Sequence, residues 1–143
     1  MGFKVVIGVL GSALLVALVV TMVRISGPAV ESDGPSGLIK RESALRDKAE
    51  RILKEANGRF SSPKGPVIAS SSLRFEGEVL RIQVGPGWDR MRRSDRARLV
   101  EYVASEYVPF WKTQMKSRRE PAIILREGDR RVGLHTQIDH WVH

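Results

Sequence analysis

The chain has no cysteine among its 143 residues. It therefore has no disulfide, no thiolate ligand for zinc and no thiol nucleophile. It is also poor in aromatic residues, at 6% of the sequence, and in acidic ones, since 16 Asp and Glu stand against 24 Lys and Arg. The resulting net charge of +8 indicates either a basic, solvated surface or acidic partners.

No catalytic motif is present either. Residues 85–87, Gly-Pro-Gly, are not followed by the Lys-Ser/Thr pair that completes a phosphate-binding loop. The three serines at 70–72 do not form a nucleophile elbow. Glu76 and Glu78 lie two residues apart on a predicted strand, which favours an exposed edge over an acid/base pair. We therefore expect neither enzymatic activity nor a cofactor.

Charge is absent from the whole stretch between Lys4 and Arg24. A helix of that length measures roughly 28 Å, close to the ~30 Å of a bilayer's hydrocarbon core. We predict a retained transmembrane anchor at residues 1–24, although a cleaved signal peptide is the alternative. Small residues at four-residue spacing would let this helix pack closely in lipid. They are Gly8 with Ser12 and Ala13 with Ala17.

Basic residues are also missing just beyond the predicted anchor. Residues 25–39 contain no Lys or Arg but include Glu31 and Asp33, whereas Lys4 precedes the apolar stretch. This asymmetry predicts an inner (cytoplasmic) membrane protein with its amino terminus in the cytoplasm and its carboxy-terminal domain on the periplasmic side.

The rest of the chain divides into a linker and one domain. Glycine, proline and serine at 25–37 indicate a flexible linker, and residues 38–143 are long enough for one small soluble domain. Hydrophobic periodicity predicts a helix at 38–57 that ends at Asn57-Gly58, strands at 67–76 and 78–84, and a second helix capped by Ser94. Strands at 122–125 and 131–136 follow. Pro109 predicts a kink or a break in the second helix.

This order predicts the fold class. Helix-strand-strand-helix-strand-strand, with helices and hairpins segregated, favours a small two-layer α+β domain with a mixed or antiparallel sheet, preceded by the transmembrane helix.

A dense group of arginines precedes and enters the second predicted helix. Its members are Arg90, Arg92, Arg93, Arg96 and Arg98. Positive charge at a helix start opposes the helix dipole, which indicates a surface that binds anionic groups. Arginine rather than lysine favours paired hydrogen bonds to carboxylate or phosphate. The alternative is a solvated face whose arginine stems cover apolar surface.

The last six residues contain three apolar side chains, Ile138, Trp141 and Val142. We predict that this tail docks on a partner or on the domain's own sheet. His135, His140 and His143 lie in the same region, but a chain end without supporting ligands is a poor metal site, and no metal is expected.

Two functions fit these features best. The first is a non-catalytic accessory subunit of a multi-subunit inner-membrane assembly, respiratory or photosynthetic by analogy, whose partners are other membrane-protein subunits and the lipid bilayer. The second is a stand-alone anchored binding domain for an anionic ligand: a lipid headgroup, a cell-wall polymer or an acidic protein. Anionic lipid is a further candidate partner, and no nucleic acid is expected.

Overall fold

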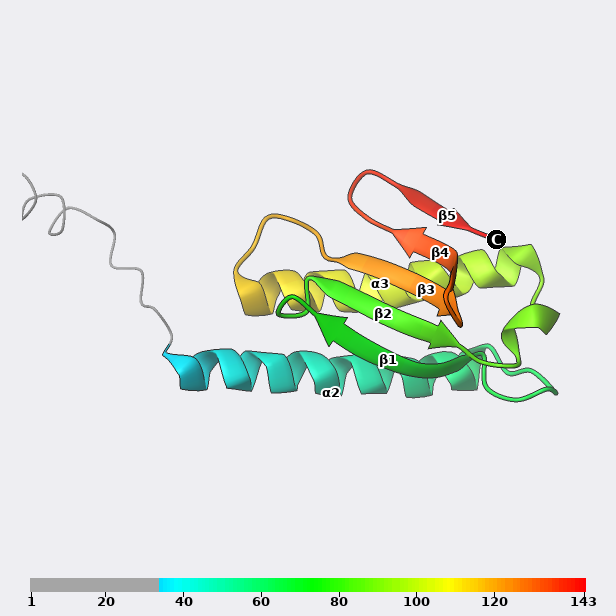
Figure 1. Ribbon diagram of the computed structural model, residues 1–143, viewed down its shortest axis with the longest axis horizontal. Coiled ribbons are helices and arrows are strands. Elements are labelled where there is room, and N and C mark those ends of the chain that lie inside the picture. The colour runs from blue at the N-terminus through cyan, green and yellow to red at the C-terminus, as the bar shows by residue number, and fades with distance from the viewer. Residues whose placement is uncertain (1–33) are drawn as a thin grey trace, which may run out of the picture. The chain divides into compact units, whose positions relative to one another are not determined.

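Two long helices and a five-stranded sheet make up residues 34–143, the part of the chain that the computed structural model describes (Figure 1). The predicted anchor at 1–24, with Gly8, Ser12, Ala13 and Ala17, lies outside the described residues, as do residues 25–33 of the predicted linker. No helix in the described part is long and apolar enough to cross a membrane.

Helix α2, Pro35–Arg59, starts earlier and ends later than its sequence pattern predicts. Pro35 occupies the first turn, where its fixed φ favours the helix, so residues 35–37 belong to α2 and not to the linker. Asn57 does not end the helix, which continues to Arg59, and its side chain is hydrogen-bonded to the backbone of Ile68. The predicted apolar stripe is confirmed, since Leu45, Ala49, Ile52 and Ala56 are all buried.

The sheet contains β1 (Ile68–Arg74), β2 (Val79–Val84), β3 (Ala122–Glu127), β4 (Arg130–His135) and β5 (His140–Val142), side by side in that order. Only the β2–β3 pair is parallel, so the sheet is mixed. The predicted α+β class and element order are confirmed through β4. The fifth strand was not expected, because three residues are too few to give a periodic pattern.

Helix α3, Arg93–Met115, connects the parallel pair β2 and β3. Of the kink or break predicted at Pro109, the break is wrong, since the helix continues to Met115. Pro109 lies on the exposed side, while Val108 and Trp111 on either side of it are buried in the core. Ser94 is not the N-cap either, because that position is occupied by Arg92.

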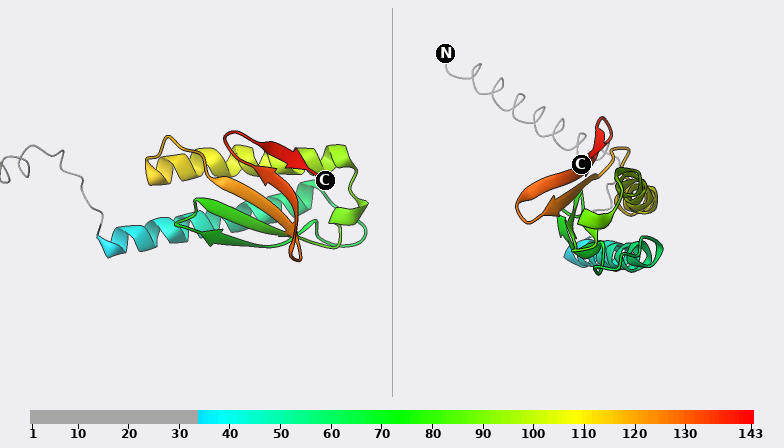
Figure 2. Two further views of the ribbon diagram at one scale, coloured as in Figure 1. Left: turned by 45° about the horizontal axis from the view of Figure 1, so that its top comes forward. Right: turned by 90° about the vertical axis from the view of Figure 1, so that its right-hand side faces the viewer.

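Both helices cover one face of the sheet, as the end-on view in Figure 2 shows. Alternate strand residues face the helices and form the core with the helix stripes. The largest fully buried strand residues are Ile68, Leu80, Ile82, Ile123 and Leu125. Tyr107 of α3 crosses this core and donates a hydrogen bond of 2.8 Å to the carbonyl of Gly77, in the β1–β2 turn. Burial raises the pKa of the Tyr107 hydroxyl.

Candidate anion-binding cleft

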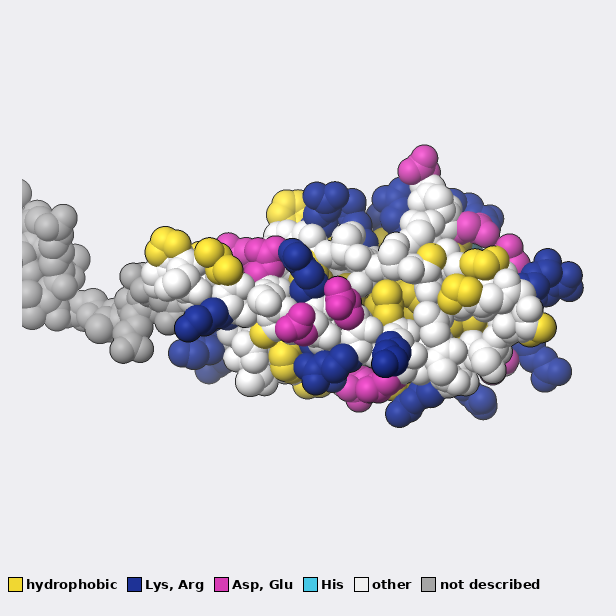
Figure 3. Space-filling view, turned by 90° about the horizontal axis from the view of Figure 1, so that it is seen from below, with side chains coloured by type: hydrophobic (Ala, Val, Ile, Leu, Met, Phe, Trp, Pro, Cys, Tyr) yellow, Lys and Arg dark blue, Asp and Glu magenta, His cyan; other side chains and the backbone are white. Residues whose placement is uncertain are grey.

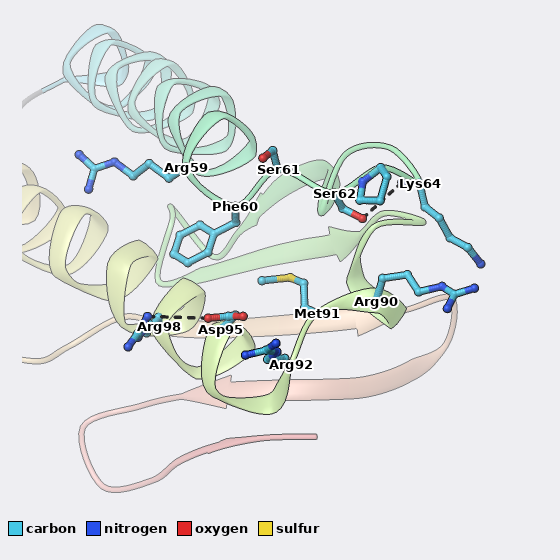
Figure 4. Close-up of a pocket in the computed structure, with 11 residues that line it drawn as sticks. Arg59, Phe60, Ser61, Ser62, Lys64, Arg90, Met91, Arg92, Asp95 and Arg98 are labelled. Atoms are coloured by element: carbon cyan, nitrogen blue, oxygen red, sulfur yellow. Dashed lines mark hydrogen bonds and ion pairs between the residues drawn. The ribbon is translucent and has the colours of Figure 1, made fainter.

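A cleft of about 740 Å³ opens at one end of the domain (Figure 4). One wall is the loop between α2 and β1, and the other is the short 3-10 helix η1 (Trp88–Arg90) with the first turn of α3. The lining residues are Arg59, Phe60, Ser61, Ser62, Pro63, Lys64, Arg90, Met91, Arg92, Asp95 and Arg98. Five of them are basic and one is acidic.

Glycine and tryptophan hold the two walls together. The backbone N–H of Gly87 donates to the carbonyl of Pro66 at 3.1 Å, and a Cβ on Gly87 would lie 2.5 Å from the carbonyl oxygen of Gly65. Only glycine allows such a close approach of the two backbones. Trp88 follows directly and is 2% exposed, which anchors η1 in the core. The loop that carries Arg90 and Arg92 is therefore fixed against the loop that carries Lys64.

Four cationic side chains line the opening. Lys64, Arg90 and Arg92 are exposed, and the Arg98 side chain, 74% exposed, lies 3.8 Å from Asp95. Arg59 differs, because its guanidinium stacks 4.5 Å from the ring centre of Tyr102 and extends away from the cleft in Figure 4. Burial, followed by a hydrogen bond to Glu55, raises the pKa of Tyr102 to about 12, so this ring stays neutral beside Arg59.

The start of α3 adds to the positive potential of the cleft. Arg92 is the N-cap residue and makes no side-chain capping bond, and the Asp95 N–H donates to its carbonyl at 3.0 Å. The N-terminus of a helix carries a partial positive charge. Asp95 is the acidic residue of that first turn and offsets part of the charge. Unpaired N–H groups and guanidinium forks together bind carboxylate or phosphate oxygens.

The cleft also has an apolar part. Phe60 and Met91 are partly buried and pack against the hydrophobic core from opposite walls. Ser61 and Ser62 lie in the loop beside them, and the Ser62 hydroxyl accepts a hydrogen bond from the Lys64 backbone at 3.4 Å. The cleft can therefore contact an apolar side chain and an anionic group of the same ligand.

The structure separates the five arginines that the sequence groups together. Arg90, Arg92 and Arg98 line the cleft, whereas Arg93 is exposed and does not. Arg96 donates hydrogen bonds to the carbonyls of Trp88, at 3.2 Å, and His143, at 2.8 Å. Its guanidinium also lies 5.1 Å from the Trp88 ring centre. Arg96 thus joins η1 to the chain end and is not available to a ligand.

The chain end is ordered as β5, which pairs with β4. Val142 is 8% exposed and belongs to the core, and Trp141 is partly covered. Ile138 is 95% exposed in the β4–β5 turn, so it does not pack on the domain's own sheet, and its docking on a partner stays a prediction. The turn bends at this point because Thr136 and Asp139 bond to each other through backbone and side chain.

Two of the three histidines meet across the β4–β5 pair. Nδ1 of His135 lies 3.0 Å from Nδ1 of His140, whereas His143 stacks on Trp141 instead. Burial and then the neighbouring His140 lower the pKa of His135, while Glu120 opposes this shift. Within residues 34–143 no three His, Asp or Glu side chains gather closely enough to hold a metal ion.

Sequence reasoning missed the other half of the cleft. Phe60, Ser62 and Lys64 fall in a segment that its prolines mark as a loop, about thirty residues before the arginine group. The available signal was the glycine at each loop end, Gly65 and Gly87, which permits close contact between the two loops. Comparisons with family models, curated proteins and solved structures found no match to the chain.

Proposed function

We propose that this chain is a non-catalytic, single-pass accessory subunit of a multi-subunit inner-membrane assembly, and that its cleft binds an acidic segment of a neighbouring subunit. The observation that carries this proposal is the composition of the cleft, which is lined by Lys64, Arg90, Arg92 and Arg98 but by a single carboxylate, Asp95. An anionic partner would balance this excess of positive charge.

The size and lining of the cleft favour a protein segment over a bare anion. A volume of about 740 Å³ far exceeds what one phosphate or carboxylate fills. Phe60 and Met91 would contact an apolar side chain next to the acidic ones, and burial of one such side chain contributes about 1.5–3 kcal/mol. Exposed ion pairs contribute only about 0–1 kcal/mol each, so several must act together with that apolar contact.

The predicted anchor supports the same function. An anchored domain stays within reach of other subunits of the same membrane, which raises its effective concentration toward them. A cleft of modest intrinsic affinity would then suffice for stable association.

A second candidate is a stand-alone anchored domain that binds an anionic lipid headgroup. Lys64 and Arg90 favour it, because both are exposed and their side chains, from the two walls, extend to the same side of the cleft in Figure 4. Basic side chains near a membrane surface gain about 1 kcal/mol each from anionic lipid.

Blue-native electrophoresis of membranes solubilised in mild detergent tests the first candidate. We expect the wild-type chain to migrate in a larger assembly. A variant with Arg90, Arg92 and Arg98 replaced by Gln should migrate at its own mass, while the matched control Arg93→Gln should stay in the assembly. A wild-type chain that migrates alone would contradict the subunit function, and a triple variant that stays assembled would show that the cleft is not the contact.

A further inference from the structure

Strand β1 forms an edge of the sheet, and beyond a register irregularity between Ile68 and Ser70 it pairs regularly with β2 and carries neither lysine nor proline. Its first six residues, Ile68 to Leu73, contain no charge and no proline, and three of them are serines. Exposed edges in natural proteins are commonly protected by lysine, proline or a covering segment, because their unpaired N–H and C=O groups can pair with another strand. The β5 edge, in contrast, is only three residues long.

A side chain already occupies the beginning of this edge in the way that a strand would. The Asn57 amide donates to the carbonyl of Ile68 and accepts from its N–H, both at 2.9 Å. Beyond Ile68, no hydrogen bond within residues 34–143 reaches Ser70, Ser71 or Ser72 from the side of α2. Because alternate residues of an edge strand direct their backbone groups outward, this stretch can still accept a partner strand.

A groove of about 450 Å³ runs between this edge and α2. Helix α2 lies along the length of β1, as Figure 1 shows, and contributes Arg46, Ala49, Glu50 and Leu53 to the groove. The strand contributes residues 70–73. Figure 3, which views the domain from below, shows side chains of both charges spread among apolar ones on the face where α2 lies. The groove walls are thus a helix and the outer edge of β1, whose other edge pairs with β2.

We propose that this groove binds an extended peptide of another protein, which adds to β1 as a sixth strand. Side chains of an added strand alternate between the two faces of the sheet. Those on the helix side would meet Leu53, Ala49 and Leu73, so apolar residues fit there. Those on the other side would lie over Ser70 and Ser72, beside Arg81.

Arg81 determines which charge fits on the face of the sheet away from the helices. It pairs with Ser72 in the β1–β2 register, and its Nε is buried without a hydrogen-bond partner in the described residues. The small serine leaves space for its guanidinium to reach across β1. This side forms a polar hollow of about 320 Å³ that also includes Arg126, whose guanidinium already lies 3.8 Å from Asp129. A glutamate on the added strand would pair with Arg81.

The positive charge of this face favours an acidic peptide over a second copy of the same chain as the added strand. Pairing of β1 with another β1 would bring the basic residues Arg74 and Arg81 of both copies to one face of the joined sheet. Like charges at such close range are destabilising, whereas an alternating apolar and acidic peptide places opposite charges together.

Binding of a synthetic peptide to the full-length chain in mild detergent tests the proposal. The probe is a fluorescent peptide of about seven residues, a usual strand length, in which valine and glutamate alternate. We expect saturable binding and slowed amide exchange at residues 70–73. N-methylation of alternate residues should weaken binding at least tenfold, because it removes the backbone donors and leaves every side chain in place. Replacement of glutamate by lysine should weaken it by a similar factor.

Matched variants separate this groove from the basic cleft. Arg81→Gln should weaken binding of the probe several-fold, whereas Arg119→Gln, an exposed residue in the α3–β3 loop, should leave it unchanged. The double variant Arg92→Gln/Arg98→Gln should also leave it unchanged. No detectable binding, equal binding of the N-methylated peptide, slowed exchange at the cleft instead of β1, or dimerisation of the chain through β1 without peptide would overturn the proposal.

Discussion

Arg96 and Arg92 lie one helical turn apart at the start of α3, yet their surroundings differ completely. Arg96 donates to two carbonyl groups, one in η1 and one at the chain end, and stacks on Trp88. Arg92 is exposed and lines the cleft. The same residue type thus stabilises the domain at one position and is free to bind a ligand at the other.

The difference arises from what each side chain can reach. One helical turn places Arg96 between η1 and the end of the last strand, where it reaches the carbonyl of Trp88 on one side and that of His143 on the other. Arg92 precedes that turn and extends over the opposite loop, where side chains of the same charge prevail. We therefore expect stability and binding to respond to different arginines of the group, and the following changes separate the two.

The largest effect is expected from Arg96→Met, which keeps the apolar stem and removes the charge and all donors. Hydrogen bonds from charged groups contribute about 1.5–3 kcal/mol, and the His143 carbonyl would lose the bond that Arg96 donates, whereas the Trp88 carbonyl would keep its bond from the Met91 N–H. We predict that the free energy of unfolding of the full-length chain in detergent falls by about that amount. An unchanged urea midpoint would show that Arg96 does not join η1 to the chain end.

An effect of similar size is expected from deletion of residues 138–143. The truncated chain loses β5, the buried Val142 side chain and the acceptor that His143 offers to Arg96. Burial of one such side chain contributes about 1.5–3 kcal/mol, but exposed Ile138 contributes nothing. We predict a lower melting temperature for the truncated chain and no change for Ile138→Ser. Equal losses for both variants would mean that Ile138 has a contact elsewhere in the chain.

A smaller effect is expected from acidification. Because burial and His140 lower the pKa of His135, the unfolded chain takes up this proton at a higher pH than the folded chain does. Stability should be complete above about pH 6.5, the usual histidine value, and should fall as the pH drops through the lower pKa of the folded state. Replacement of His140 by Gln should make this fall shallower. A fall of equal steepness in both proteins would assign it to other groups.

The smallest effect is expected from Arg93→Gln. Arg93 is exposed and outside the cleft, and surface substitutions of this kind usually change stability by less than about 0.5 kcal/mol. We predict an unchanged unfolding midpoint and unchanged assembly on native gels. A marked loss of stability would show that Arg93 stabilises the domain as Arg96 does, and a marked loss of assembly would show that it binds a partner as Arg92 does.

Local patterns predict most of the fold. The 3–4 spacing of Leu45, Ala49, Ile52 and Ala56 identifies α2, and the alternation of Leu80, Ile82 and Val84 identifies β2, because the core covers one face of each element. The same reasoning fails at Pro109, where packing of the neighbouring residues outweighs the local preference of proline.

Long-range contacts explain what local patterns miss. The cleft requires loops about thirty residues apart to meet, and only the tight approach at Gly87 brings Lys64 opposite Arg90. The role of Arg96 depends on β5, a strand too short to be recognised from three residues. In both cases the residues were visible in the sequence, whereas their partners were fixed by the tertiary fold.

The most direct test of the central claim is binding of an acidic peptide to the cleft. The probe is a short fluorescent peptide that carries several glutamates and one leucine, added to the full-length chain in mild detergent at low salt. We predict that Arg92→Gln/Arg98→Gln weakens its binding at least tenfold, about 1.4 kcal/mol, while unfolding stays unchanged and Arg93→Gln binds as tightly as the wild type. Equal binding by wild type and double variant, or no binding by either, would contradict an anion-binding role for the cleft.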